Sequence, residues 1–189
     1  MCNGKILSAE FNHWIPFTDA VQHENGPFSE VPTGSGVYTL RVSKIGTPDL
    51  TRVKSDFLDS AFMKARSRMD KVSGELFAEL GLGKEQAWTD TDYYVRRLAR
   101  VDRIAMNRRG IACPIVYIGR ANNLWRRMKE LAFGGHTANA PFWALLMSGW
   151  KFDLGFHKAR PKAEVHVEAH LKELFRELHE DNLPPLVER

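Results

Sequence analysis

The chain has 189 residues, of which 43% are hydrophobic and 26% charged, a composition that is ordinary for a soluble globular protein. This length is sufficient to bury a core, and we expect one domain over residues 1–189. The formal net charge is +4, and residues 51–110 hold 13 Lys and Arg against nine Asp and Glu. This excess favours contact of the central segment with a polyanion.

Several classes of protein are disfavoured at once. No apolar run is long enough to cross a bilayer, so we expect no membrane segment. The N-terminal sequence MCNGKILSAEFNHW lacks the apolar core of a secretory signal, which predicts a cytoplasmic protein. The two cysteines, Cys2 and Cys113, argue against a disulfide framework and against a cysteine-rich zinc site.

The first elements of the chain are an irregular arm and a strand. Residues 1–30 mix aromatic residues with turn formers and show no clean period, so we expect an N-terminal arm with room for one short element. A Pro/Gly/Ser turn then leads into residues 37–42, whose β-branched and aromatic side chains predict a strand.

Residues 46–112 carry a mainly helical pattern. One amphipathic helix is predicted over residues 92–107, with Thr89 or Thr91 as its cap. Its period of 3.6 residues is expected to place two sets of side chains on opposite faces, the apolar set Tyr94, Leu98, Val101 and Ala105 and the basic set Arg96, Arg100 and Arg103. The basic face is interpreted either as a grip on nucleic acid or as part of a dimerisation or structural cap.

The remaining elements follow in quick succession. Pro114 introduces a second strand over residues 115–118, which Gly119 is expected to end, and Asn122 or Asn123 can cap a helix over residues 124–131. Further on, the pattern predicts a short helix around residues 142–147, a third strand over 151–156, and a long helix over 163–180 that the prolines of NLPPL stop.

Two triplets on the first two predicted strands resemble the signature of the GIY-YIG nuclease superfamily. They are Gly36-Val37-Tyr38 and Tyr117-Ile118-Gly119. The resemblance continues through Ala121, Asn123, Leu124 and Arg127, and then through Glu168 and a proline-containing tail, so that it covers residues 33–44 and 113–187. It implies an α+β fold, with a small three-stranded antiparallel sheet flanked by helices and residues 46–112 as a helical insertion between the first two core strands.

The resemblance also implies a metal-dependent endonuclease that hydrolyses phosphodiester bonds of DNA. In this scheme Tyr38 activates the water, Tyr117 orients the water or a phosphate oxygen, and Arg127 stabilises the transition state through its planar fork. Glu168 binds a single Mg²⁺ or Mn²⁺, since such hard cations prefer oxygen ligands. The compact chain is typical of a restriction, mobile-element or phage-type enzyme, and cutting both strands calls for a homodimer or for sequential nicks.

Each candidate has a competitor. Tyr38 and Tyr117 are also compatible with core strand positions whose hydroxyls are satisfied. Arg126 is an alternative to Arg127, although the apolar stripe of Leu124 and Met128 favours Arg127. Glu164, one turn before Glu168, is an alternative metal ligand.

The sequence departs from the family pattern at two places. Leu131 stands four residues after Arg127, where many family members carry a histidine or tyrosine, and His136 in the following Gly-Gly-His turn is the candidate to replace it. No asparagine follows the tail prolines, and Asn182 precedes them. These departures support a second hypothesis, a catalytically inactive nucleic-acid-binding or regulatory protein that keeps the fold. The phosphate contacts predicted under either hypothesis come from Arg96, Arg100, Arg103, Arg120 and Arg126.

Overall fold

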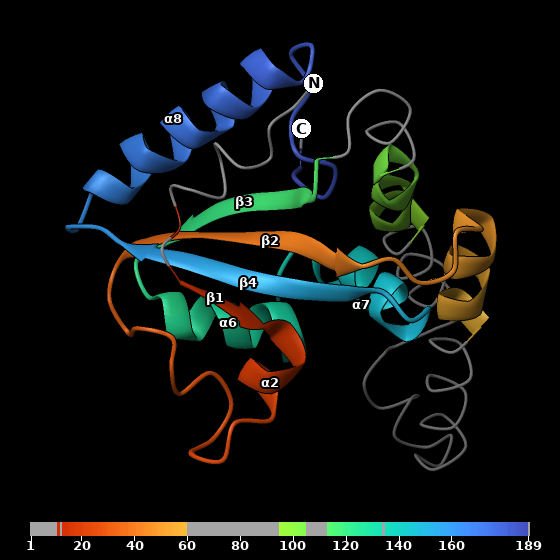
Figure 1. Cartoon of the computed structure of the whole chain (residues 1–189), viewed down its shortest axis with the longest axis horizontal. Coiled ribbons are helices and arrows are strands. Elements are labelled where there is room, and N and C mark those ends of the chain that lie inside the picture. The colour runs from red at the N-terminus through yellow and green to blue at the C-terminus, as the bar shows by residue number, and fades with distance from the viewer. Residues whose placement is uncertain (1–10, 12, 60–94, 105–112, 134, 189) are drawn as a thin grey trace, which may run out of the picture.

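The structure is a computed structural model, and it describes residues 11, 13–59, 95–104, 113–133 and 135–188. Its elements are, in chain order, β1 (Trp14–Pro16), α2 (Phe17–Val21), β2 (Gly36–Lys44), β3 (Ile115–Ala121), α6 (Leu124–Phe133), α7 (Asn139–Met147), β4 (Lys151–Lys158) and α8 (Ala163–Leu178). Residues 50–59 and 95–104 are also helical. Figure 1 shows the sheet with helices on both of its faces.

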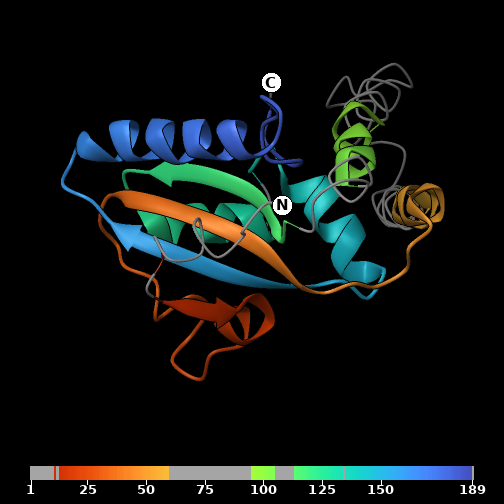
Figure 2. The same cartoon turned by 45° about the horizontal axis from the view of Figure 1, so that its top comes forward.

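The four strands form one antiparallel sheet in the order β1-β4-β2-β3. Helix α8 lies over one face, and α6 and α2 lie over the other (Figures 1 and 2). Because successive strand residues point to opposite faces, Val37 packs with Leu171 and Phe175 of α8, whereas Tyr38 belongs to the cluster that contains Leu124 of α6. The alternation along β2 therefore decides which side chains can meet on the α6 face.

The predicted α+β class is confirmed, but the predicted number of strands is wrong. The N-terminal arm contributes β1, in which Trp14 pairs with Gly155 of β4, and so the sheet has a fourth strand. Phe11 and Phe28 of the same arm are buried. A strand of three residues that ends in proline is too short to show an alternating pattern, which is why the sequence did not reveal it.

Gly119 does not end the second strand, which is a further correction. Strand β3 continues through Gly119 to Ala121, and Gly119 lies opposite Tyr38 of β2. The next helix begins as expected, because the Oδ1 atom of Asn123 accepts a hydrogen bond of 2.9 Å from the backbone N–H of Arg126. Asn123, not Asn122, is therefore the capping residue.

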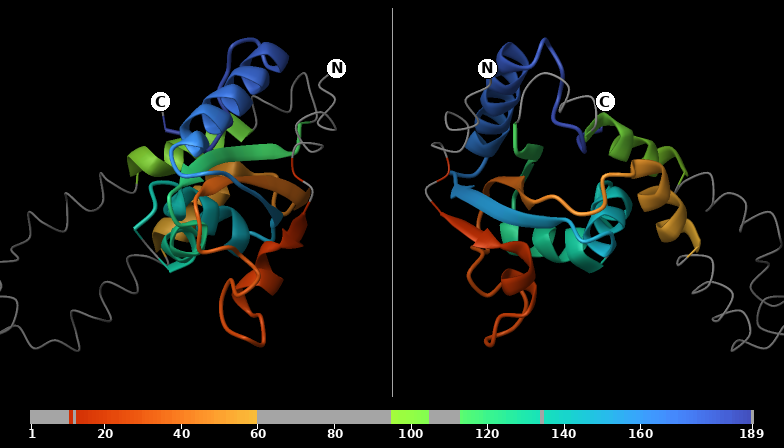
Figure 3. Two further views of the ribbon diagram at one scale, coloured as in Figure 1. Left: turned by 90° about the vertical axis from the view of Figure 1, so that its left-hand side faces the viewer. Right: turned by 45° about the vertical axis from the view of Figure 1, so that its right-hand side comes forward.

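The described parts of residues 46–112 contain two helical segments, at 50–59 and 95–104. They are joined by an ion pair of 2.7 Å between Lys54 and Asp102, and Figure 3 shows them side by side. The expectation that Arg100 lies on a solvated face is wrong, since it is only 5% exposed. Arg100 and Ile104 are four residues apart and therefore lie on the same side of the helix, and both are buried.

The rest of the predicted insertion, including Tyr94, Ala105, Thr89 and Thr91, lies outside the described residues. Within the described part of the chain, no helix combines the length and the apolar character that a membrane span requires.

Candidate active site

The two tyrosines of the triplets lie together on the α6 face of the sheet. Tyr38 pairs with Gly119 and Leu40 pairs with Tyr117, so both tyrosines project to the same side. Their rings are stacked with centroids 5.5 Å apart, and the Tyr38 hydroxyl donates a hydrogen bond of 3.4 Å to the Tyr117 hydroxyl. The pair is thus positioned by the register of β2 against β3.

Gly119 provides the space in which this pair sits. A Cβ atom at this position would lie 2.6 Å from Cε1 of Tyr117 and 2.9 Å from both Cζ and the hydroxyl oxygen of Tyr38. These distances are shorter than any ordinary carbon contact, and so a side chain at this position would displace one or both rings. The glycine of the second triplet is required by the tyrosines and not by a turn.

His136 reaches the tyrosines from the connection between α6 and α7. Its Nε2 atom lies 2.6 Å from the Tyr38 hydroxyl and 3.4 Å from the Tyr117 hydroxyl. Its Nδ1 atom accepts a hydrogen bond of 2.9 Å from the backbone N–H of Ala138. A neutral imidazole that accepts through Nδ1 carries its proton on Nε2, so His136 donates to the oxygen of Tyr38.

The charge state of His136 agrees with this assignment. Burial, followed by the positive charges of Arg127, Arg100 and Arg97, lowers the pKa of His136 to about 3, and the side chain is therefore neutral near pH 7. In this arrangement His136 is a hydrogen-bond donor to Tyr38 and has no free nitrogen with which to act as a base. Leu131, where the resemblance implied a histidine or tyrosine, is fully buried in the core.

Both tyrosine hydroxyls are protonated at neutral pH. Burial raises the pKa of Tyr38 well above its usual value, Tyr117 raises it further, and the charge and hydrogen bond of Arg127 act in the opposite direction. Burial also raises the pKa of Tyr117, while its hydrogen bond with Tyr38 and the charge of Arg127 lower it. Tyr38 is completely buried and Tyr117 is 8% exposed, so Tyr117 is the outer member of the pair.

Arg127 is the arginine of α6 that acts on the tyrosines. Its side chain is 30% exposed, and its Nη1 atom is held by Glu130 at 2.7 Å. Arg126 is 64% exposed and makes a longer ion pair of 3.6 Å with the same Glu130. The buried stripe of Leu124 and Met128 orients the helix so that Arg127, and not Arg126, adjoins the site.

Glu168 lies apart from this group. It projects from α8, which covers the opposite face of the sheet, although its charge contributes to raising the pKa of Tyr117. Its Oε2 atom is 2.9 Å from Arg120 and its Oε1 atom is 2.8 Å from Lys172. The alternative ligand Glu164 is buried, and its Oε2 atom has no hydrogen-bond partner among the described residues.

The predicted ligand of Mg²⁺ or Mn²⁺, Glu168, is engaged by neighbouring side chains. Both oxygens of Glu168 are already paired with cations, so its charge is compensated. In the part of the chain that the structure describes, no group of three or more His, Cys, Asp or Glu side chains could hold a metal ion. A cation at Glu168 would have to compete with Arg120 and Lys172.

The sequence did not reveal a set of arginine contacts behind the site. Arg97 donates to the backbone carbonyl of His136 at 3.4 Å, and Arg100 donates to that of Thr137 at 3.1 Å. Arg100 also binds the C-terminal segment, through the Leu186 carbonyl at 3.4 Å and the Glu188 carboxylate at 3.0 Å. Because the carbonyl acceptors are distant in the sequence and identical in every residue, no motif predicts such contacts.

The arginines expected to contact phosphate differ in their surroundings. Arg100 is buried, and Arg103 donates to the Val187 carbonyl at 3.0 Å, so both help to hold the C-terminal segment. Arg120 is 45% exposed beside Glu168. Arg96 lies on the exposed side of its helix.

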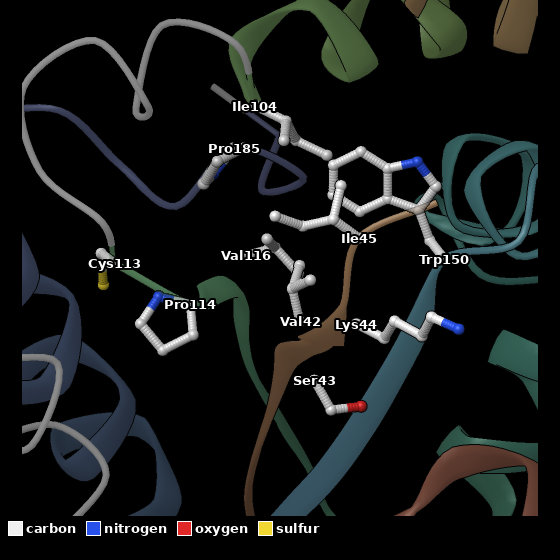
Figure 4. Close-up of a pocket in the computed structure, with 10 residues that line it drawn as sticks. All are labelled: Val42, Ser43, Lys44, Ile45, Ile104, Cys113, Pro114, Val116, Trp150 and Pro185. Carbon is white, nitrogen blue, oxygen red and sulfur yellow. The ribbon is translucent and has the colours of Figure 1, made fainter. Parts of the chain in front are cut away.

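A cavity of about 520 Å³ lies where β2 ends and β3 begins (Figure 4). Its walls come from both strands and from Trp150, and include Val42, Ile45 and Val116. None of the candidate site residues lines it, so this cavity is separate from the tyrosine pair.

In comparisons with known proteins, no family model, curated protein or solved structure matches the chain.

Proposed function

We propose that this chain is an endonuclease that hydrolyses phosphodiester bonds of DNA at the Tyr38–Tyr117 pair. The observation that supports the proposal is the convergence of both triplet tyrosines with Arg127 and His136, on adjacent antiparallel strands and over a glycine that makes room for them. The hydroxyls of Tyr38 and Tyr117, together with the Arg127 guanidinium, can hydrogen-bond to a water molecule and to a phosphate oxygen.

In the proposed reaction a water oxygen attacks phosphorus and the bond to the leaving oxygen breaks, with one proton lost from the water and one gained by the leaving oxygen. Arg127 stabilises the negative charge that develops on the phosphoryl oxygens. Tyr117, the outer hydroxyl, orients the water or a phosphate oxygen. Tyr38 is held by His136. Its ionised form, present after its own proton has passed to solvent, accepts the proton of the attacking water, and the leaving oxygen takes a proton from solvent.

This role of Tyr38 predicts a definite pH dependence. Because burial raises the pKa of Tyr38, its deprotonated form is scarce at pH 7. The cleavage rate should therefore rise with pH through the alkaline range until Tyr38 is ionised. A requirement for Mg²⁺ or Mn²⁺, with Glu168 as ligand, stays a prediction, and the steps above use only the side chains of the chain.

A plasmid-nicking assay tests the proposal. The wild type is compared with Tyr38→Phe, Tyr117→Phe, Arg127→Ala and Glu168→Ala, each with Mg²⁺, with Mn²⁺ and with EDTA. Loss of a transition-state contact should lower the rate roughly 100-fold or more. Arg126→Ala is the matched comparison, since it removes the same charge from the exposed side of the same helix and should lose much less activity than Arg127→Ala. Equal rates for Arg126→Ala and Arg127→Ala would contradict the assigned site.

A second function is favoured by two specific observations. Tyr38 is completely buried, and both oxygens of Glu168 are paired with cations, as suits a protein that binds nucleic acid without cutting it. Under this alternative the wild type binds DNA but nicks no plasmid in either metal, and Tyr38→Phe binds with unchanged affinity.

A further inference from the structure

The connection between β4 and α8 carries a compact group of positive charges. Residues 157–162 read His-Lys-Ala-Arg-Pro-Lys, with three cations and no acidic residue. The side chains of Lys158, Arg160 and Lys162 are all exposed. Within the described part of the chain, none of the three has a carboxylate partner at ion-pair distance. Their charges are therefore available to an external anion.

The backbone of this connection is fixed at both of its ends. The N–H of Ala159 donates to the Ser35 carbonyl at 2.9 Å, and the N–H of Ala163 donates to the Arg160 carbonyl at 2.9 Å. Lys158 also pairs with Gly36, the first residue of β2. The three cations are thus presented by an ordered part of the fold at the end of the sheet where β2 begins.

Other cations gather at the same end. Gly36 pairs on its other side with Ala121, which follows Arg120, and a Cβ atom on Gly36 would lie 2.7 Å from Leu124, the first residue of α6. The first turn of α6 carries Arg126, and both arginines are substantially exposed. Residues 113–162 hold eight Lys and Arg against two Asp and Glu, a larger excess than that of residues 51–110.

This end of the sheet lies opposite the two helices of the insertion. Figures 1 and 2 both place the β4–α8 connection at one extreme of the sheet and residues 50–59 and 95–104 at the other. Tyr38 is two residues along β2 from Gly36, a distance of about 7 Å, or about two base-pair steps of a DNA strand. A backbone bound at this end can therefore lead into the tyrosine pair.

We infer that Lys158, Arg160 and Lys162, together with Arg120 and Arg126, form the surface along which the phosphate backbone of a DNA substrate lies. The inference rests on the proposed function, and it moves the main phosphate contacts away from the insertion, where Arg100 and Arg103 bind the C-terminal segment. A lipid surface fits less well, because membrane-binding sites place large apolar side chains beside the cations. Among the described residues, only Val165 of the exposed large apolar side chains lies near this connection.

The test measures binding separately from cleavage. In a Tyr38→Phe background, the triple variant Lys158→Gln, Arg160→Gln, Lys162→Gln is titrated against a short fluorescent DNA duplex over a range of salt concentrations. The control triple variant, Lys44→Gln, Arg52→Gln, Lys151→Gln, removes the same charge from exposed positions away from this end. Circular dichroism melts establish that both variants fold. Plasmid nicking is measured with the same triples in the wild-type background.

Loss of three phosphate contacts should reduce the slope of log K against log salt by about 2.7, and the control should keep the parental slope. The inference would be overturned by equal slopes for the two triple variants, or by a parent that does not bind DNA. Both proteins are also titrated against anionic phospholipid vesicles. A triple variant that binds these vesicles less tightly than the parent, but binds DNA equally tightly, would likewise overturn the inference. Nicking distinguishes the two proposals. If the wild type cuts DNA and the triple variant keeps the parental salt slope, only the proposed phosphate-binding surface is refuted. If the wild type is inactive but its binding of DNA depends on Lys158, Arg160 and Lys162, only the proposed endonuclease activity is refuted.

Discussion

The position of Gly119 makes a strong prediction about the tyrosine pair. In Gly119→Ala, the added methyl group would lie 2.6 Å from the Tyr117 ring and 2.9 Å from the Tyr38 ring and hydroxyl. Neither neighbour is the end of a flexible chain, because both are aromatic rings of buried strand residues. The rings must move, and with them the 2.6 Å contact between Tyr38 and His136.

The magnitude follows from two opposing effects. Inserting a methyl group into a well-packed core costs about 1–3 kcal/mol. Replacing glycine by alanine also restricts the unfolded chain, which stabilises the protein by about 0.4–1 kcal/mol. The net loss in the free energy of unfolding should be about 1–2 kcal/mol. For a chain of this size, that corresponds to a decrease in Tm of roughly 2–8 °C.

The measurement is a thermal melt followed by circular dichroism, together with plasmid nicking. Gly34→Ala is the matched control, because a Cβ atom at Gly34 meets nothing within 4 Å. We expect Gly119→Ala to melt at a lower temperature and to lose cleavage, and Gly34→Ala to remain close to the wild type. If the two variants had the same Tm, the steric account of Gly119 would be refuted.

Two further predictions concern the residues that hold the site. The folded-state pKa of His136 is about 3 against 6.5 for the free side chain, so the unfolded chain binds an extra proton between these values. As pH falls through this window, this group should reduce stability by about 1.4 kcal/mol per pH unit. Urea denaturation should show a shallower pH dependence for His136→Gln, and an unchanged dependence would contradict the neutral, buried histidine. Arg100→Ala should lower the free energy of unfolding by about 2–3 kcal/mol, because the Thr137 and Leu186 carbonyls lose a charged donor. Arg96→Ala, at an exposed position on the same helix, should change it by less than about 0.5 kcal/mol, and equal losses would argue against the role of Arg100.

The sequence predicted the parts of the fold that depend on near neighbours along the chain. β2, β3, β4 and the four-residue spacing of Leu124 and Met128 on α6 follow from local periodicity, and Asn123 caps α6 through a residue three positions away. Alternation along β2 and β3 sets which residues share a face within each strand, and the register of the pairing then brings Tyr38 and Tyr117 to the same face. Arg127 was selected over Arg126 by the same local argument.

Tertiary structure alone decided the rest, because those contacts join residues that are distant in the sequence. His136 meets Tyr38 across 98 positions, and Arg100 binds the Leu186 carbonyl across 86. The pairing of β1 with β4, the ring contacts that require Gly119, and the cations on both oxygens of Glu168 likewise depend on how the elements pack. Local propensity and period determine which elements form and which way their side chains point. Only packing determines which side chains meet, and therefore which groups surround the two tyrosines.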